Sequence, residues 1–193
     1  MKQFYQCLGV AISCGVGFIA CAGADSTELL ESDEAIADEG VEDAFRTFTA
    51  YTSEEFPPIE CNANRLVDGF DCDGGYCDLV SLDCESVSGF SFGESGFGPF
   101  ISEETQGGST GAGDFICDSN EWMTGIDCNG GYCDNVSIEC TTVSNKVKSS
   151  CQWSAFISEE NAAFQAPAGR FVDGVDCAGD YCDRMRFRHC IPL

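Results

Sequence analysis

Carboxylates and cysteines are the residues of this chain whose types and spacing could support chemistry. Three stretches share the pattern G-x-D-C-x-G-x-Y-C-D, at Gly69–Asp78, Gly125–Asp134 and Gly174–Asp183. In each copy, two aspartates flank a pair of cysteines. Because Ca²⁺ prefers oxygen ligands, the pattern indicates a candidate cation site in each copy, formed by the pairs Asp71 with Asp78, Asp127 with Asp134, and Asp176 with Asp183.

A second acidic element precedes each copy and could complete such a site. The tripeptide Ser-Glu-Glu begins at Ser53, Ser102 and Ser158, and its carboxylates could add oxygens around a cation. The alternative is that backbone N–H groups of the glycine-rich turns hydrogen-bond the aspartates, as is common at turns. We favour this alternative, because the spacing of a known calcium loop is not present.

The glutamates of these elements also raise the question of glycosidase activity, since two carboxylates can divide the acid and base roles of glycoside hydrolysis. They are Glu54, Glu55, Glu103, Glu104, Glu159 and Glu160. A catalytic pair is normally needed once, whereas these pairs occur three times. The single histidine, His189, falls in a predicted strand beside a cysteine. We therefore expect a protein that is not an enzyme, with hydrolase activity as the minor alternative.

The cysteine spacing predicts a disulfide framework. Cys72 and Cys77 bracket four residues that include two glycines, which permit the positive φ angles of a tight hairpin. Two further pairs, in copies one and two, share a separation of 23 residues. Zinc is the competing interpretation, but C-x4-C is not the usual zinc-knuckle spacing. The expected bridges are Cys61–Cys84, Cys72–Cys77, Cys117–Cys140, Cys128–Cys133, Cys151–Cys190 and Cys177–Cys182.

The hairpin then predicts a strand register. If Cys72 faces Cys77, Asp71 faces Asp78, and Val67, Gly69, Val80 and Leu82 share the core face. The third copy has one residue more before its closing cysteine, for which we expect a β-bulge near His189. The corresponding core residues of the other copies are Met123, Gly125, Val136, Ile138, Val172, Gly174, Met185 and Phe187.

The first 47 residues have a different composition from the rest of the chain. Residues 1–22 are typical of a secretory signal peptide, with Lys2 before an apolar run. Cleavage at an A-x-A site and lipidation of Cys21 are both compatible with this segment. Residues 23–47 include nine acidic residues from Asp25 to Asp43 and are predicted to be a disordered tether. Export would place the twelve remaining cysteines in an oxidising compartment.

Residues 48–193 form three repeats of about fifty residues, at about 48–98, 99–152 and 153–193. Short alternating strands, glycine-rich turns and the absence of helical periodicity predict an all-β fold with pseudo-threefold symmetry. We expect a disulfide-stapled β-prism, with a β-trefoil as the alternative.

The repeats resemble those of the vitelline membrane outer layer protein I family. Each ends in a core strand that follows an aspartate and closes on a cysteine, and the stretch from Cys133 to Cys140, CDNVSIEC, is the nearest approach to that family's ending. The resemblance covers residues 48–193. It implies a β-prism of three four-stranded sheets and a role as a secreted coat or matrix component.

The net charge of −24 restricts the partners. It excludes nucleic acid and anionic membrane surfaces, apart from membrane attachment through a lipid on the N-terminus. Two function classes remain: a secreted or surface-tethered module that binds carbohydrate or an extracellular surface protein, and a purely structural coat or matrix protein. In the first, the loop Gln106–Gly113 and an outward Trp122 would make contact. Arg184 and Arg186 could form one basic patch.

Overall fold

The computed structural model describes residues 48–102 and 113–193 of the 193-residue chain. The predicted signal peptide, Cys21, the acidic tether and most of the loop Gln106–Gly113 lie outside these residues. The described body is all-β, as expected, and its helical elements are three single turns of 3₁₀ helix. None of the helices within the described ranges is long and apolar enough to cross a membrane.

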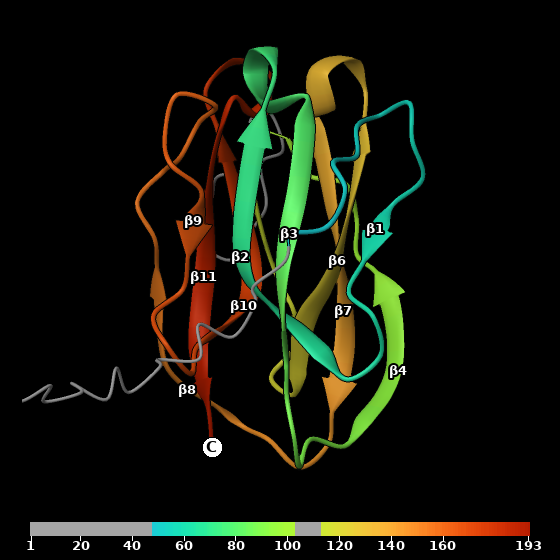
Figure 1. Ribbon diagram of the computed structural model, residues 1–193, viewed down its shortest axis with the longest axis vertical. Helices are drawn as coiled ribbons and strands as arrows, with labels where there is room; N and C mark the ends of the chain where they lie inside the picture. The colour runs from blue at the N-terminus through green and yellow to red at the C-terminus, as the bar shows by residue number, and fades with distance from the viewer. Residues whose placement is uncertain (1–47, 103–112) are drawn as a thin grey trace, which may run out of the picture. The chain divides into compact units, whose positions relative to one another are not determined.

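Each repeat contributes one long antiparallel hairpin (Figure 1). A 3₁₀ turn closes each hairpin, and the three turns touch one another at one end of the body, which we call the apex. The hairpins are β2 (Arg65–Asp73) with β3 (Leu79–Ser86), β6 (Glu121–Asn129) with β7 (Asn135–Val143), and β10 (Phe171–Ala178) with β11 (Arg184–Pro192). The turns are η1 (Gly75–Cys77), η2 (Gly131–Cys133) and η3 (Asp180–Cys182).

Short strands from neighbouring repeats extend each hairpin into a sheet. The sheet orders are β1-β6-β7-β4, β5-β10-β11-β8 and β3-β2-β9. In the last sheet, isolated bridges from Phe48 and Thr52 add to the free side of β3. The repeats therefore interlock, because every hairpin pairs with segments that lie outside it in the chain. The short strands are β1 (Ile59–Glu60), β4 (Phe92–Phe97), β5 (Asp114–Ile116), β8 (Lys148–Trp153) and β9 (Phe164–Gln165).

The predicted hairpin register is wrong by three residues. Cys72 lies opposite Val80 rather than Cys77, and Asp71 lies opposite Ser81 rather than Asp78. The turn is longer than expected, because the last strand pair is Asp73 with Leu79 and Cys77 lies within the turn. The other two hairpins repeat this arrangement.

A bulge in the first strand of each hairpin explains why most of the predicted core residues are nevertheless buried. In copy one the register shifts between Val67 and Gly69, so that Val67 and Phe70 point into the same core although they are three positions apart, an odd number for one face of a regular strand. Gly69 does not share that face, which corrects the prediction. A Cβ there would lie 3.0 Å from the backbone oxygen of Phe164 in β9, so glycine permits the close approach of the edge strand. Gly125 and Gly174 occupy the same position against Ile59 and Phe115.

The structure joins the cysteines in the six expected pairs. Cys61 follows edge strand β1, and its bridge to Cys84 on β3 ties the sheet of β6 and β7 to the sheet of β2 and β3. Cys117 follows β5, and its bridge to Cys140 on β7 ties the sheet of β10 and β11 to the sheet of β6 and β7. Two of the three sheet junctions are therefore covalent.

At the third junction, between the sheet of β10 and β11 and the sheet of β2 and β3, Ala166 and His189 occupy the positions of the two bridging cysteines. The backbone N–H of Ala166 donates to the oxygen of Asp68, just as Cys61 donates to Thr124 and Cys117 to Asp173. His189 lies opposite Val172, as Cys84 lies opposite Val67 and Cys140 opposite Met123. The extra residue in copy three thus displaces the cysteine by one position. Beside His189, the hairpin bulge lies on β10, between Val172 and Gly174, whereas the irregularity of β11 itself is in its pairing with β8, between His189 and Ile191. The predicted bulge is therefore only partly correct.

Aromatic packing takes the place of the missing bridge. Phe164, beside the junction, stacks on Phe187 at 5.7 Å and contacts the ring of His189 at 5.8 Å between centroids. His189 is 3 % exposed. The displaced Cys190 bonds to Cys151 on β8 and lies in a second buried cluster with Trp122 and Phe171.

The variant Ala166→Cys with His189→Cys should form an additional disulfide, because the two positions match the 61–84 and 117–140 pairs. The bridge would close a loop of the same 23-residue separation and raise the free energy of unfolding by up to about 3 kcal/mol. Mass spectrometry before and after alkylation, with chemical denaturation, measures both effects. Ala166→Ser with His189→Ser is the matched control, and two free thiols in the double-cysteine variant would contradict the equivalence.

His189 should make the protein less stable in acid. Burial, and next the positive charge of Arg170, lower the pKa of its imidazole below the ordinary value. The folded state therefore favours the neutral ring. This contribution to stability is complete above the unfolded-state pKa of about 6.5 and is lost as the pH falls below it.

We expect the Tm of the wild type to fall relative to that of His189→Gln between about pH 7.5 and about pH 5. The carboxylates are common to both proteins, so their titration largely cancels in the difference. Differential scanning calorimetry measures it. Equal Tm changes in the two proteins would show that folding leaves the pKa of His189 unchanged.

Candidate functional site

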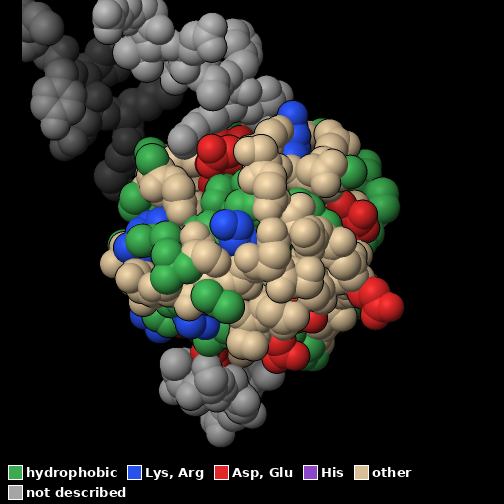
Figure 2. All heavy atoms as spheres, turned by 90° about the horizontal axis from the view of Figure 1, so that it is seen from below, with side chains coloured by type: hydrophobic (Ala, Val, Ile, Leu, Met, Phe, Trp, Pro, Cys, Tyr) green, Lys and Arg blue, Asp and Glu red, His purple; other side chains and the backbone are tan. Residues whose placement is uncertain are grey.

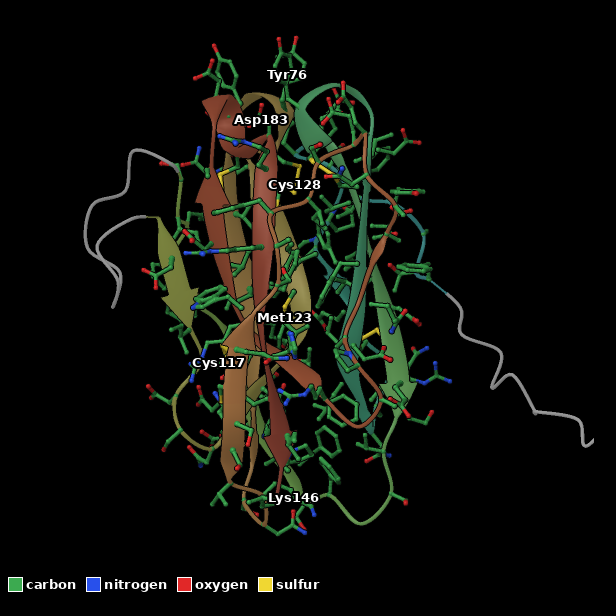
Figure 3. The ribbon with its side chains drawn as sticks, turned by 90° about the vertical axis from the view of Figure 1, so that its left-hand side faces the viewer. Tyr76, Cys117, Met123, Cys128, Lys146 and Asp183 are labelled. Carbon is green, nitrogen blue, oxygen red and sulfur yellow. A yellow bond between two sulfur atoms is a disulfide. The ribbon has the colours of Figure 1, made fainter. Side chains whose placement is uncertain are left out.

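The three apical turns bring one tyrosine from each repeat together. Tyr76, Tyr132 and Tyr181 are central residues of η1, η2 and η3, and we call them the tyrosine crown. Figure 3 shows Tyr76 at this end of the body and Lys146 at the opposite end. The ring centroids are 5.5, 5.8 and 6.1 Å apart. These separations are those of aromatic rings in contact, so the crown is a closed cluster with no cage between the rings.

Each crown tyrosine has a left-handed backbone conformation. The φ angles are 63° at Tyr76, 64° at Tyr132 and 61° at Tyr181. This region costs a non-glycine residue roughly 1–2 kcal/mol. The tyrosines nevertheless remain 46 %, 49 % and 47 % exposed, so burial offsets only part of that cost. A strained residue with an exposed aromatic side chain is typical of a contact site.

The glycine before each turn is required by the aspartate after it. Gly74 has φ 79°, and a Cβ at that position would overlap the Asp78 carboxylate, which folds back over the turn. The same relation joins Gly130 to Asp134 and Gly179 to Asp183. The aspartate that ends each motif thus shapes the turn that presents the tyrosine.

Disulfides fix the crown from beneath. The Cα atoms of Cys72 and Cys77 are 5.0 Å apart, within the usual range for a disulfide. The sulfur of Cys77 then contacts the carbonyl oxygen of Asp183 in the next turn at 3.5 Å. Cys133 contacts Asp78 at 3.3 Å, and Cys182 contacts Asp134 at 3.2 Å. These contacts form a ring of three, so each turn supports its neighbour.

Carboxylates surround the crown. Glu54, from the first Ser-Glu-Glu element, accepts a hydrogen bond of 3.4 Å from the backbone N–H of Tyr132. Burial raises the pKa of Asp78, and the charges of Glu54 and Asp73 raise it further. Asp180 lies within η3 itself. In copy one, Glu54 of the Ser-Glu-Glu element thus reaches the apex, whereas Glu103 and Glu104 of copy two lie outside the described residues.

Positive charge is concentrated elsewhere. The turn sequences DGGYCD, NGGYCD and AGDYCD contain neither lysine nor arginine. Arg184 follows η3 and lies 3.8 Å from Asp183. Figure 2 shows the opposite end of the body, where Lys and Arg side chains gather toward one side. The apex is therefore an acidic surface around an aromatic centre.

The predicted aspartate pairs do not face each other. Asp71, Asp127 and Asp176 lie opposite Ser81, Ser137 and Arg186 in their hairpins, because the register differs from the predicted one. Their second members, Asp78, Asp134 and Asp183, follow the apical turns instead.

The first-strand aspartates have separate partners. Asp71 accepts a hydrogen bond of 2.5 Å from the hydroxyl of Tyr51, and Asp176 forms a 2.7 Å ion pair with Arg186. The side chains of Asp73 and Asn129 instead accept hydrogen bonds of 2.7 Å from the backbone N–H groups of the glycines that follow them. In copies one and two, the residue before the turn therefore accepts the backbone hydrogen bond that the alternative assigned to the paired aspartates.

Among the residues that the structure describes, the predicted aspartate pairs do not belong to a cluster of candidate metal ligands. Within residues 48–102 and 113–193, the one group of three candidate ligands with atoms within 4.8 Å of one another is Cys151, Asp173 and Cys190. The two cysteines form a disulfide, so they offer no thiolate. Asp173 already pairs with Lys148 at 2.8 Å and Arg188 at 3.3 Å. This group is best explained as a buried ion-pair network beside a structural disulfide.

Two shallow grooves lie on the outer faces of the sheets, at equivalent positions. One, of about 220 Å³, is lined by Glu60, Arg65 and Glu139 among others. The other, of about 800 Å³, is lined by Trp153, Lys148 and Arg188 among others. Burial raises the pKa of Asp173, which lies beneath the second groove, while its two cations act in the opposite direction. Neither groove brings together side chains from all three repeats.

The other predicted contact residues have different roles. Trp122 is fully buried and packs against Phe171, so its predicted outward position is wrong. Arg184 is exposed, whereas Arg186 lies over the rings of Trp153 and Phe156 and pairs with Asp176. The crown was missed at the sequence level, although the tyrosine recurs in all three motifs. The available signal was a bulky residue two positions after a glycine and directly before a cysteine, in a tight turn.

The variant Tyr132→Asn should change the free energy of unfolding by less than about 1 kcal/mol. It removes two crown contacts, each worth about 0.5–1.5 kcal/mol, but asparagine tolerates the left-handed conformation. Phe70→Ala is the control, because Phe70 is fully buried and its loss should cost about 3–5 kcal/mol. Guanidinium denaturation compares the two. Equal losses would make the crown a stabilising element rather than a contact surface.

Comparisons with protein-family models, curated proteins and solved structures found no match to this chain. The resemblance to the vitelline membrane outer layer protein I family therefore stays a prediction from the sequence. The apical site stands on its own geometry, in which three interlocked repeats present three half-exposed tyrosines at the centre of an acidic surface.

Proposed function

We propose that this protein is an exported, non-enzymatic binding module whose tyrosine crown contacts carbohydrate on an extracellular surface. The observation that carries the proposal is the crown itself. Three tyrosines from three repeats are held in the left-handed region and left about half exposed. Stability alone does not account for a bulky residue there, since glycine or asparagine would fit the same turns at lower cost.

The chemistry of the apex suits a sugar. The apolar faces of pyranose rings pack on aromatic side chains, and their hydroxyl groups donate hydrogen bonds to carboxylates. Phenol hydroxyls add donors and acceptors at the crown. Two acceptors of this kind belong to the apex, because Glu54 hydrogen-bonds the backbone of Tyr132 and Asp180 directly precedes Tyr181 in η3. The disulfides beneath the turns limit the entropy lost on binding, because the contact surface is already ordered.

We propose a β-prism for the described body. Equivalent residues recur three times: the bulge in each hairpin, the hydrogen bond between each edge segment and the neighbouring sheet, and the contact ring under the crown. An architecture with three sheets around one core accounts for all three recurrences.

The cysteine content supports an extracellular location. Six disulfides in a body of this size are typical of an oxidising compartment. Export by residues 1–22, with or without a lipid on Cys21, is part of the proposal. A lipid would hold the body at a membrane surface through the acidic tether.

A glycan array probed with the disulfide-intact protein tests the function. We expect retention on a subset of glycans and loss of at least about fivefold in affinity for Tyr132→Ser, since one aromatic contact of this kind is worth about 1–3 kcal/mol. Phe97→Ser is the matched control, because Phe97 is 38 % exposed and lies on β4, away from the turns. If no glycan is retained and the protein instead assembles into insoluble aggregates of folded copies, the coat or matrix alternative replaces this proposal.

A further inference from the structure

The charges around the crown select among carbohydrates. Five of the residues in or flanking the apical turns are ionisable acids, and Glu54 adds a sixth carboxylate: Asp73, Asp78, Asp134, Asp180, Asp183 and Glu54. The only nearby cation, among the residues that the structure describes, is Arg184, which lies 3.8 Å from Asp183. Burial raises the pKa of Asp78, and the charges of Glu54 and Asp73 raise it further, so at least these three carboxylates repel one another.

We infer that the crown takes an amine-bearing saccharide, a polymer of hexosamine units whose amino groups are free and protonated. This inference rests on the proposed function and names the ligand class of the same site. A protonated amine would relieve the repulsion among the carboxylates, and the faces of the tyrosines attract cations as well. A neutral or acidic sugar would leave the repulsion in place or add to it.

The closed geometry of the crown decides the form of the ligand. The rings touch one another at 5.5–6.1 Å, so a cation cannot enter between them as in an aromatic cage. It must lie across the exposed faces and edges, with the amines reaching the surrounding carboxylates. An extended saccharide with an amine on successive units can do both, and the net charge of −24 attracts such a polycation from a distance.

A matched pair of ligands tests the inference. One is a hexosamine oligomer with free amines, and the other is the same oligomer after N-acetylation, which removes the charge and keeps the sugar rings. Calorimetric titration of the disulfide-intact full chain, at a pH where the amines are protonated and the carboxylates ionised, should show at least about tenfold tighter binding of the free-amine form. A higher salt concentration should reduce the difference in affinity between the two oligomers, because salt screens exposed charges.

Three variants separate the contributions. Asp180→Asn removes one carboxylate beside the crown and should weaken binding of the free-amine form by up to about fivefold, the size of one exposed ion pair. Glu85→Gln is its control, since Glu85 is exposed at the far end of the hairpin, opposite Leu66, and should change nothing. The triple variant Tyr76→Ser, Tyr132→Ser and Tyr181→Ser should weaken binding by at least about tenfold, with circular dichroism confirming the fold.

Each outcome is decisive. Equal binding of the two oligomers would overturn this inference and leave the proposed function intact. Binding of neither oligomer, together with an empty glycan array, would overturn both. Unchanged binding by the triple tyrosine variant, or equally tight binding of oligolysine of the same charge, would show diffuse attraction to an acidic protein rather than recognition of a saccharide at the crown.

Discussion

The left-handed turn between each pair of hairpin cysteines is the constraint on which the rest of the structure depends. Tyr76 and Cys77 both have positive φ angles, and together they swing the cysteine back to its partner on β2. Five residues, 74–78, therefore lie in the turn between the last paired residues of the two strands. This sets the register of the hairpin, and with it the residues that enter the core and those that remain at the apex.

The three turns also depend on one another. In each turn, a disulfide sulfur contacts a backbone carbonyl oxygen beside the neighbouring turn. The apex is therefore a cooperative unit rather than three independent loops. The interlocked sheets below the apex add to this cooperativity, because edge strands such as β1 and β9 pair with hairpins that lie far from them in the sequence. A tyrosine placed at the tip of such a turn is presented in one orientation, which suits recognition of a surface.

Copy three differs from the other two repeats in its disulfide bonding and in its charged side chains. Copy three has Ala166 and His189 in place of the two bridging cysteines, with Phe164 packed on His189, and its Cys190 joins Cys151 on β8. Three cations of the sheet that contains β10 and β11, namely Lys148, Arg186 and Arg188, pair with the buried Asp173 and with Asp176. Their charges are compensated within that sheet. The acidic character of the apex is thereby left intact, and it is this surface that a cationic ligand would meet.

The sequence by itself determined the fold class, the threefold repetition and the pairing of the cysteines. Five of the disulfides follow from spacing that recurs within the repeats, and Cys151–Cys190 follows because these are the two cysteines left over. It could not determine the register or the meeting of the tyrosines. The register depends on two left-handed residues and a bulge at Asp68, neither of which leaves a periodic signal. The crown depends on contacts between turns more than forty residues apart. Only the packing of the three sheets brings those turns to a common end. The same packing buries Trp122.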